Sequence, residues 1–186
     1  MTERNMGVLA EATETALIVP VPAAEAVVGP YRAILDDSAP LGVPAHVTVL
    51  SPFLPPERVT EQVLGDLRAC LTAVPSFGCV FARVAWFGTQ VVWLAPEPDA
   101  PFRALTGSVW HRFPECPPYG GAYPDAIPHL TVGTAHRAEP AAMRRAAVEV
   151  RARLPIRALV DRVRLIAGTG APGSWGTVAE FALPSA

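Results

Sequence analysis

The 186-residue chain contains no lysine, so all 15 of its basic residues are arginines. Without lysine, neither Schiff-base chemistry nor the lysine of a nucleotide-binding P-loop is available. Cysteine is scarce as well: Cys70, Cys79 and Cys116 make an odd count, and no two of them form a C-x-x-C pair. This usage argues against a disulfide framework and against a zinc site. We expect the three thiols to be small buried side chains in a reducing compartment.

Long apolar runs and a signal sequence are also missing. No apolar stretch approaches the roughly 18 residues that span a bilayer, and the N-terminus lacks a basic start followed by an apolar segment and a cleavage site. These features predict a soluble cytoplasmic protein with no membrane partner. The four histidines are dispersed, with no H-x-H or H-x-x-x-H pair, so we expect neither a metal nor another cofactor.

The charge of the chain is low and unevenly distributed. The net charge is −2, which does not suit a protein that holds long nucleic acid by charge alone and fits a small nucleotide better. Eight of the 15 arginines lie between Arg137 and Arg164. We interpret this cluster first as a solvated helix face, with a phosphate-attracting rim as the alternative.

Hydrophobic residues make up 51% of the chain and the 21 prolines are scattered, which indicates a globular fold whose elements the prolines delimit. We expect one bilobal domain at 15–184 after a flexible, polar N-terminus at 1–14. Apolar spacing predicts helices over residues 23–37, 55–74, 100–113 and 138–154, with a break or kink at Pro30 in the first. Apolar and β-branched runs predict strands over residues 16–22, 45–53, 77–88, 90–98, 129–135, 156–169 and 174–184.

The order of these elements repeats weakly along the chain. In each half, a His-aliphatic-Thr-Val strand is followed by a long helix and then by a pair of strands. The two tetrapeptides, HVTV at 46–49 and HLTV at 129–132, begin 83 residues apart. Strand pairs mixed with helices favour an α+β fold over a doubly wound parallel sheet.

Strand alternation gives each tetrapeptide a polar side and an apolar side. His46 and Thr48 point one way while the valines point the other, and His129 and Thr131 repeat the pattern. Residues i and i+2 of a strand lie roughly 6.5–7 Å apart, so an imidazole and a hydroxyl can reach the same phosphate-sized anion. We therefore predict that the two strands face each other across a shared site.

Two histidines on opposite sides of a phosphate suit the opening of a cyclic phosphodiester. One histidine takes a proton from water and the other protonates the departing ribose oxygen, and both tasks need a pKa near neutral. Hydroxyls and backbone N–H groups can hold the non-bridging oxygens as charge builds. We assign His129 as the general base and His46 as the general acid, and the near symmetry of the motifs leaves the reverse assignment open.

The motifs HVTVLSPF and PHLTVG resemble the paired signature of the 2H phosphoesterase superfamily and, within it, of the 2′-5′ RNA ligase-like proteins. The segments FGCVFARVAWFG, QVVWLAPEP, FPECPPY and SWGTVAEFALP resemble the usual order of that family as well. The resemblance covers residues 15–184 and implies a bilobal, pseudo-symmetric α+β fold, with two antiparallel sheets lining a central cleft and helices outside. It also implies His46 and His129 as the catalytic pair, Thr48 and Thr131 as phosphate-binding residues, and activity on 2′,3′-cyclic phosphates, 2′-5′ linkages or related nucleotide esters.

Base-stacking residues and the exact activity stay open at this point. Phe53 and Tyr123 flank the motif strands and are preferred as stacking partners for a base, with packing as the alternative for both. The leading hypothesis is a metal-independent phosphoesterase that acts, as a monomer, on a 2′,3′-cyclic phosphate of a nucleotide or RNA end. A non-catalytic nucleotide- or RNA-binding module and 2′-5′ RNA end joining on the same residues are the alternatives.

Overall fold

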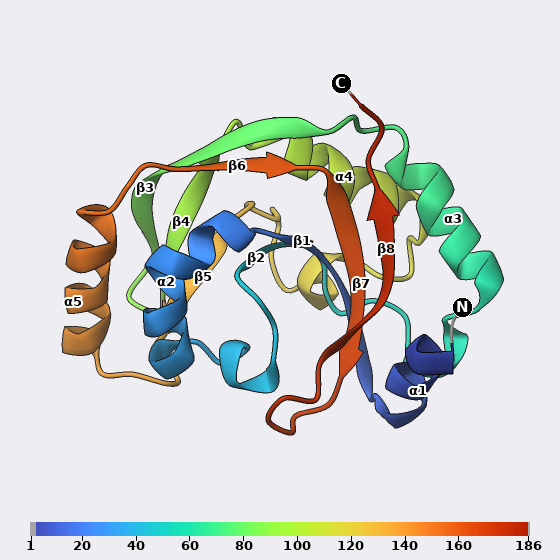
Figure 1. The fold of residues 1–186 in the computed structure, drawn as a ribbon, viewed down its shortest axis with the longest axis horizontal. Coiled ribbons are helices and arrows are strands. Elements are labelled where there is room, and N and C mark those ends of the chain that lie inside the picture. The colour runs from blue at the N-terminus through green and yellow to red at the C-terminus, as the bar shows by residue number, and fades with distance from the viewer. Residues whose placement is uncertain (1–2, 186) are drawn as a thin grey trace.

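The computed structural model describes residues 3–185 as an α+β fold built on two four-stranded antiparallel sheets (Figure 1). The strands are β1 (Glu14–Pro20), β2 (His46–Leu50), β3 (Phe77–Phe87), β4 (Val91–Glu97), β5 (Leu130–Thr134), β6 (Ile156–Val160), β7 (Arg162–Gly168) and β8 (Gly176–Ala182). The helices are α1 (Glu3–Glu11), α2 (Pro22–Leu35), α3 (Glu61–Leu71), α4 (Ala100–Arg112) and α5 (Pro140–Arg151). Short 3₁₀ helices η1 (Ala39–Leu41), η2 (Pro56–Arg58) and η3 (Pro118–Gly121) lie in connecting segments. The predicted α+β fold with two antiparallel sheets is confirmed.

The two histidine strands occupy equivalent places in the two sheets. One sheet has the order β2-β1-β7-β8 and the other has the order β5-β4-β3-β6, so β2 and β5 are both edge strands. Strand β2 pairs with β1, and β5 pairs with β4, so each edge strand pairs with the strand that precedes it in the chain. In both cases a helix connects the two paired strands. The edge strands β2 and β5 also contact each other. The weak repeat in the sequence thus corresponds to matching places for the two histidine strands, whereas the strands that follow them are distributed differently between the sheets.

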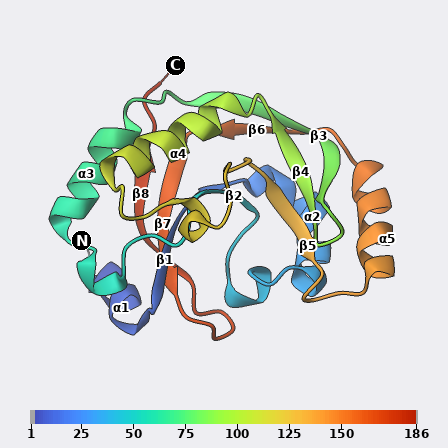
Figure 2. The same cartoon turned by 180° about the vertical axis from the view of Figure 1, so that it is seen from behind.

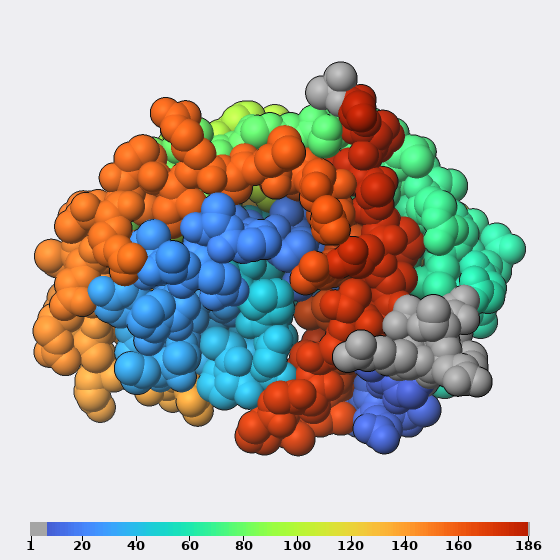
Figure 3. All heavy atoms as spheres, in the orientation of Figure 1, coloured from blue at the N-terminus to red at the C-terminus, as the bar shows by residue number. Residues whose placement is uncertain are grey.

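Two connecting helices tie the sheets together. Helix α2, which links β1 to β2, packs against β5 and β6 of the other sheet, while α4, which links β4 to β5, packs against β2. Helices α3 and α5 lie at opposite ends of the molecule in both ribbon views (Figures 1 and 2). In the space-filling view, α2 fills the surface between α5 and the β7–β8 pair (Figure 3). Because α2 and α4 each contact the opposite sheet, the two histidine strands are held in a defined relation.

The contact between α2 and β5 depends on a glycine. A Cβ atom at Gly133 would lie 2.8 Å from the Cβ of Leu35 and 3.3 Å from its carbonyl oxygen. The last residue of α2 therefore approaches the backbone of β5 more closely than any side chain at position 133 would allow. This gives the glycine of the PHLTVG motif a packing function.

One hydrophobic core runs through both sheets. Its fully buried side chains include Phe81 and Leu130 in one sheet and Leu17 and Phe181 in the other. The three cysteines are free thiols, two of them buried and one partly buried, as their number and spacing predicted. Burial of this shared apolar surface is the main force that holds the sheets together.

The segment 156–169 differs from the single strand predicted for it. It forms β6 in one sheet and β7 in the other, with Asp161 between them. The carbonyl oxygen of Asp161 accepts a hydrogen bond from the N–H of Leu183 at 2.8 Å. The two pieces are separated by Asp161 alone, so the apolar residues on both sides of it predict one continuous strand.

Helix boundaries differ from the prediction in three places. Helix α1 forms where a flexible end was expected, and its Leu9 is buried against the fold. Helix α2 continues through Pro30 without a break. Helix α3 begins later than predicted because the Thr60 hydroxyl caps it, accepting a hydrogen bond from the N–H of Val63 at 3.3 Å.

Candidate active site

His46 opens β2, and its strand shows the predicted alternation. His46 and Thr48 are partly exposed, whereas Val47 and Val49 are buried in the core. In the register of the sheet, Thr48 lies opposite Ile18 of β1. The imidazole and the hydroxyl therefore project from the same side of the sheet.

The second motif strand repeats this arrangement. His129 immediately precedes β5, and both His129 and Thr131 are partly exposed while Leu130 and Val132 are fully buried. In the register of the second sheet, Thr131 lies opposite Trp93 of β4. Both predicted histidines thus occupy the start of an edge strand, with a threonine two residues further on.

The two imidazoles are oriented by the same hydrogen bond. Nδ1 of His46 donates to the carbonyl oxygen of Pro44 at 2.8 Å, and Nδ1 of His129 donates to that of Ile127 at 2.8 Å. A carbonyl oxygen only accepts, so each Nδ1 carries a proton. In the neutral imidazole, Nε2 is then the unprotonated nitrogen, free to accept a proton from a substrate or from water.

Polar side chains of α2 hold the turn before β2. Glu25 accepts the N–H of Ala45 at 2.5 Å, and Nη2 of Arg32 donates to the carbonyl oxygen of Val43 at 3.2 Å. Arg32 is 2% exposed and forms a buried ion pair with Asp36 at 2.7 Å. The carbonyl that binds the first histidine lies between these two anchored residues, so the network positions that histidine.

Around His129, three aromatic rings take the place of the polar network that lies behind His46. Phe87 and Trp93 meet the imidazole edge-on, at 5.0 Å and 5.8 Å between ring centroids, and Tyr119 stacks on it at 6.3 Å with 23° between the planes. The indole Nε1 of Trp93 is buried without a hydrogen-bond partner among the described residues.

Tyr119 connects the two motif strands. Its ring stacks on His129, and its phenolic hydroxyl shares a hydrogen bond with the hydroxyl of Thr48. Burial raises the pKa of Tyr119 to about 12, although the bond with Thr48 opposes this rise. The backbone of Tyr119 is left-handed, with φ of 52°, and its N–H donates to the carbonyl oxygen of Ser51 at 2.7 Å. One side chain thus contacts a predicted residue of each strand.

Burial lowers the pKa of both histidines. The pKa of His46 falls to about 4, chiefly through burial and further through the positive charges of Arg32 and His129, while its bond to Pro44 opposes the fall. The pKa of His129 is also lowered by burial, against the effect of its bond to Ile127. The effect of one imidazole on the pKa of the other places the two within electrostatic reach.

Sequence reasoning did not identify Phe87, Trp93 and Tyr119 as site residues. Trp93 carries a usable signal, because it lies on the strand that pairs with the second motif and directly opposite Thr131. For Tyr119 the sequence signal is its place in the loop before the second motif, where Tyr123 is the preferred residue, and its contact with both motif strands depends on a left-handed turn.

The two predicted stacking residues lie in different surroundings. Phe53 is 6% exposed and packs edge-on against Phe113 at 5.1 Å, so it belongs to the core and its prediction as a stacking partner is wrong. Tyr123 is 66% exposed, and its ring meets Tyr119 edge-on at 5.8 Å. Of the two, only Tyr123 offers a ring face to a ligand.

Other ionisable groups lie apart from this arrangement. Among residues 3–185, no group of three or more His, Cys, Asp or Glu side chains is placed to hold a metal ion. His136 is an exposed side chain 3.7 Å from Asp37, and His111 is exposed on α4. No helix in the described part of the chain is long and apolar enough to cross a membrane.

Comparison with known proteins identifies related folds. The family model of the 2′-5′ RNA ligase superfamily matches residues 19–171. E. coli LigT complexed with 3′-AMP superposes with a TM-score of 0.58 and 17% identity, over 93% of this chain and 99% of LigT. LigT complexed with phosphate gives 0.56 and 18%, over 94% and 99%, and the protein TT0787 of Thermus thermophilus gives 0.57 and 17%, over 92% and 98%. No curated protein sequence matches the chain.

Proposed function

Because the chain belongs to the 2′-5′ RNA ligase superfamily, we propose that it is a metal-independent phosphoesterase that opens 2′,3′-cyclic phosphates of nucleotides or RNA ends. One observation carries the proposal: each motif histidine is held through Nδ1, which leaves Nε2 free for proton transfer. The complexes of E. coli LigT with 3′-AMP and with phosphate support a nucleotide or phosphate ligand for this fold.

In the proposed reaction, a water molecule attacks the phosphorus of the cyclic ester in line with the departing ribose oxygen. Nε2 of one histidine accepts a proton of that water while the new P–O bond forms. The opposite imidazolium gives its Nε2 proton to the ribose oxygen while the old P–O bond breaks. The products are a ribose hydroxyl and a phosphate monoester, and each histidine ends in the other's initial protonation state.

Beyond burial, which lowers the pKa of both histidines, the charge of Arg32 acts on His46, and this favours His46 as the base and His129 as the acid, the reverse of the assignment made from the sequence. The base must be neutral while the acid is protonated, so a nearby positive charge suits the base. The pKa of His46 is lowered to about 4, and Arg32 is among the groups that disfavour its proton. Burial alone lowers the pKa of His129.

Hydroxyl groups of both strands are available for the non-bridging oxygens. Thr48 and Tyr119 share one hydrogen bond but hold two hydroxyl protons, so one proton of this pair is left to bind a phosphate oxygen. Thr131 supplies a hydroxyl from the second strand, on the same side as its histidine. Donors fixed before the reaction stabilise the charge that builds on the phosphate in the transition state.

Substitution of each histidine tests the proposal. In His46→Asn and His129→Asn, the shorter amide removes Nε2, and we expect kcat/KM for nucleoside 2′,3′-cyclic phosphates to fall by about 10²- to 10⁴-fold. His136→Asn is the matched control because this histidine is exposed beside Asp37, and EDTA is expected to leave the wild-type rate unchanged. If both site variants fold and retain full turnover of every cyclic phosphate tested, the proposal fails.

The family match also favours a second candidate, 2′-5′ RNA end joining. This is the reverse chemistry, in which a ribose hydroxyl replaces water as the attacking group on the cyclic phosphate. Incubation of one RNA ending in a 2′,3′-cyclic phosphate with another bearing a 5′-hydroxyl separates the two reactions, since joining produces a longer strand and hydrolysis does not. Nucleotide binding without turnover in the wild type would instead indicate a non-catalytic binding module.

A further inference from the structure

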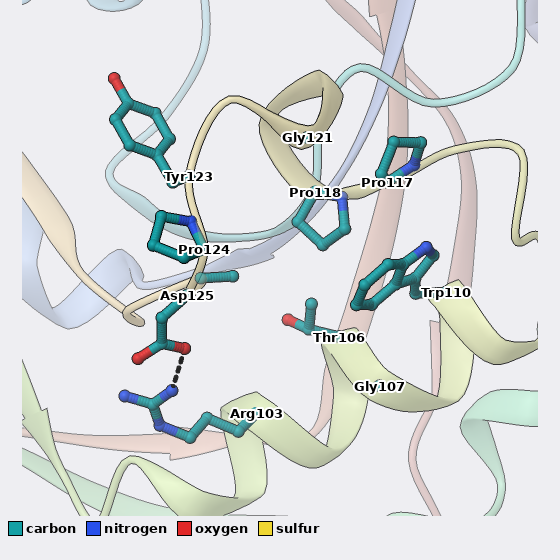
Figure 4. A pocket seen from close by; sticks show the side chains of 11 residues that line it. Arg103, Thr106, Gly107, Trp110, Pro117, Pro118, Gly121, Tyr123, Pro124 and Asp125 are labelled. Atoms are coloured by element: carbon teal, nitrogen blue, oxygen red, sulfur yellow. Dashed lines mark hydrogen bonds and ion pairs between the residues drawn. The ribbon is translucent and has the colours of Figure 1, made fainter.

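A cavity of about 440 Å³ lies between α4 and the loop that leads into β5 (Figure 4). Arg103, Thr106, Gly107 and Trp110 line it from one face of α4, since they are spaced three and four residues apart. The opposite wall is the proline-rich segment 117–126. Its volume is in the range of small-molecule binding sites.

The cavity adjoins the histidine site through two tyrosines. Tyr123 lines the cavity and meets Tyr119 edge-on at 5.8 Å, and Tyr119 in turn stacks on His129 at 6.3 Å. The floor of the cavity is fixed relative to the other histidine strand, because the Thr106 hydroxyl donates to the carbonyl oxygen of Val49 at 2.9 Å. The cavity therefore has a fixed position, and the ring of Tyr119 lies between its lining residue Tyr123 and the imidazole of His129.

Exposed apolar side chains gather on this side of the molecule. Among the described residues, six large hydrophobic side chains are exposed, and three of them, Trp110, Tyr123 and Ile127, lie at the cavity or next to it. Trp110 is 46% exposed and points from α4 toward the loop (Figure 4). At the other end of the cavity, Nη1 of Arg103 donates to Asp125 at 2.7 Å. The cavity thus combines exposed aromatic rings with one paired donor and acceptor.

We propose that this cavity binds a nucleobase of an RNA strand whose cyclic phosphate end lies at His46 and His129, namely the base one nucleotide before that end. This inference rests on the proposed function and narrows its substrate class to short oligoribonucleotides. A nucleobase offers flat faces that stack on aromatic side chains and an edge that carries both donors and acceptors. Trp110 supplies the ring at the cavity, while the ring of Tyr123 points away from α4 on the side of Tyr119 (Figure 4), and the pair of Arg103 and Asp125 supplies polar groups for the edge.

The charge of the chain agrees with binding by stacking. A net charge of −2 does not favour affinity through many phosphate contacts, whereas stacking on aromatic rings needs no excess positive charge. A proline-rich peptide is the other ligand that aromatic grooves accept. Continuity with the histidines through Tyr119 and Tyr123 favours the nucleobase, because a strand anchored at the phosphate brings its neighbouring base to this side.

Two substrates that share the reacting group test the inference. The first is adenosine 2′,3′-cyclic phosphate, and the second is the trinucleotide of adenosine that ends in the same cyclic phosphate. Trp110→Ala removes the exposed ring, and Gly107→Leu fills the cavity, since a Cβ atom at Gly107 meets nothing within 4 Å. Gly65→Leu is the control for the second variant, because Gly65 also lies inside a helix with open space at its Cβ but outside the cavity.

We expect Trp110→Ala and Gly107→Leu to lower kcat/KM for the trinucleotide by roughly five- to a hundredfold, through KM. The same variants should leave the mononucleotide within twofold of the wild type, and Gly65→Leu should leave both substrates unchanged. Equal effects on the two substrates, or no effect on the trinucleotide, would overturn the inference. So would binding of a proline-rich peptide that depends on Trp110 when trinucleotide turnover does not.

Failure of the proposed function has a different signature. In that case the wild type opens neither cyclic phosphate, and the cavity is tested by equilibrium binding of the adenosine trinucleotide with a 3′-phosphate. Binding that weakens at least fivefold in Trp110→Ala and in Gly107→Leu, but not in Gly65→Leu, supports the inference. Binding of equal strength in all four proteins overturns it.

Discussion

His46 and His129 make the same hydrogen bond in unlike surroundings: each Nδ1 donates at 2.8 Å to the carbonyl oxygen two residues earlier. The bond gives both imidazoles the same neutral tautomer. Behind His46 lies the buried network of Arg32, whereas His129 is packed among aromatic rings such as Trp93. The motif therefore makes the two histidines alike, and their surroundings make them different enough for separate tasks.

Acidification is expected to destabilise the fold. A histidine of the unfolded chain has a pKa near 6.5, whereas that of folded His46 is about 4, so between these values only the unfolded chain takes up the proton. The stability from His46 is complete above about pH 6.5 and is lost as the pH falls toward 4, with a loss of about 2 kcal/mol at pH 5. Urea unfolding at neutral and acidic pH measures this loss in the free energy of unfolding. His46→Asn should show a smaller loss, and an identical loss in both proteins would contradict this account.

The pH dependence of kcat/KM is expected to be bell-shaped, with its optimum below pH 6.5. The acidic limb reports protonation of the base, and the basic limb reports loss of the proton from the acid. The pKa of His46 lies at about 4 and that of His129 is lowered from 6.5, so both limbs shift toward acid. Initial rates with adenosine 2′,3′-cyclic phosphate across the pH range give the profile. An optimum above neutral pH would contradict the lowered pKa values of the two histidines.

Removal of Arg32 is expected to cost far more stability than removal of an exposed arginine. Arg32→Met leaves the carboxylate of Asp36 buried without its cation, and we expect a loss of about 3 kcal/mol in the free energy of unfolding. Arg83→Met is the control, because the pair of Arg83 with Glu97 is exposed and contributes about 0.5 kcal/mol. Adding Asp36→Asn to Arg32→Met should restore part of the stability. A double variant less stable than Arg32→Met would show that the ion pair is not the source of the loss.

Loss of the Tyr119 hydroxyl is expected to slow catalysis without unfolding the protein. Tyr119→Phe keeps the ring stacked on His129 but removes the phenolic proton, so we expect kcat to fall about tenfold with little change in melting temperature. Tyr119→Ala also removes the ring and should lower kcat further. Measurements of kcat at the pH optimum and of the melting temperature compare the two variants with the wild type. Equal activity of Tyr119→Phe and wild type would remove the hydroxyl from the proposed mechanism.

A methyl group at Gly133 is expected to separate α2 from β5. Gly133→Ala places a Cβ atom 2.8 Å from that of Leu35, and relief of this overlap should cost about 1–3 kcal/mol of stability. Gly78→Ala is the matched control, since Gly78 also lies in a strand but a Cβ atom there meets nothing within 4 Å. Urea unfolding of the two variants tests the difference. A Gly133→Ala protein as stable as Gly78→Ala would show that the helix can move away without cost.

Local patterns were the most reliable part of the prediction from sequence. The alternation of β2 and of the residues at β5 placed His46, Thr48, His129 and Thr131 on partly exposed sides, as the structure shows. Predictions that needed contacts between distant segments were less reliable. Phe53 flanks a motif strand in the sequence, yet it packs into the core, and nothing in its local pattern separates these two environments.

The sequence by itself determined the two His-x-Thr strands and the side from which each imidazole projects, because strand alternation depends only on neighbouring residues. Only the tertiary structure decided that segment 156–169 is divided between the sheets, that Arg32 lies behind His46, and that aromatic rings enclose His129. These features join residues far apart in the chain. They give unlike surroundings, and so unlike influences on the pKa, to two histidines that the motifs alone leave equivalent.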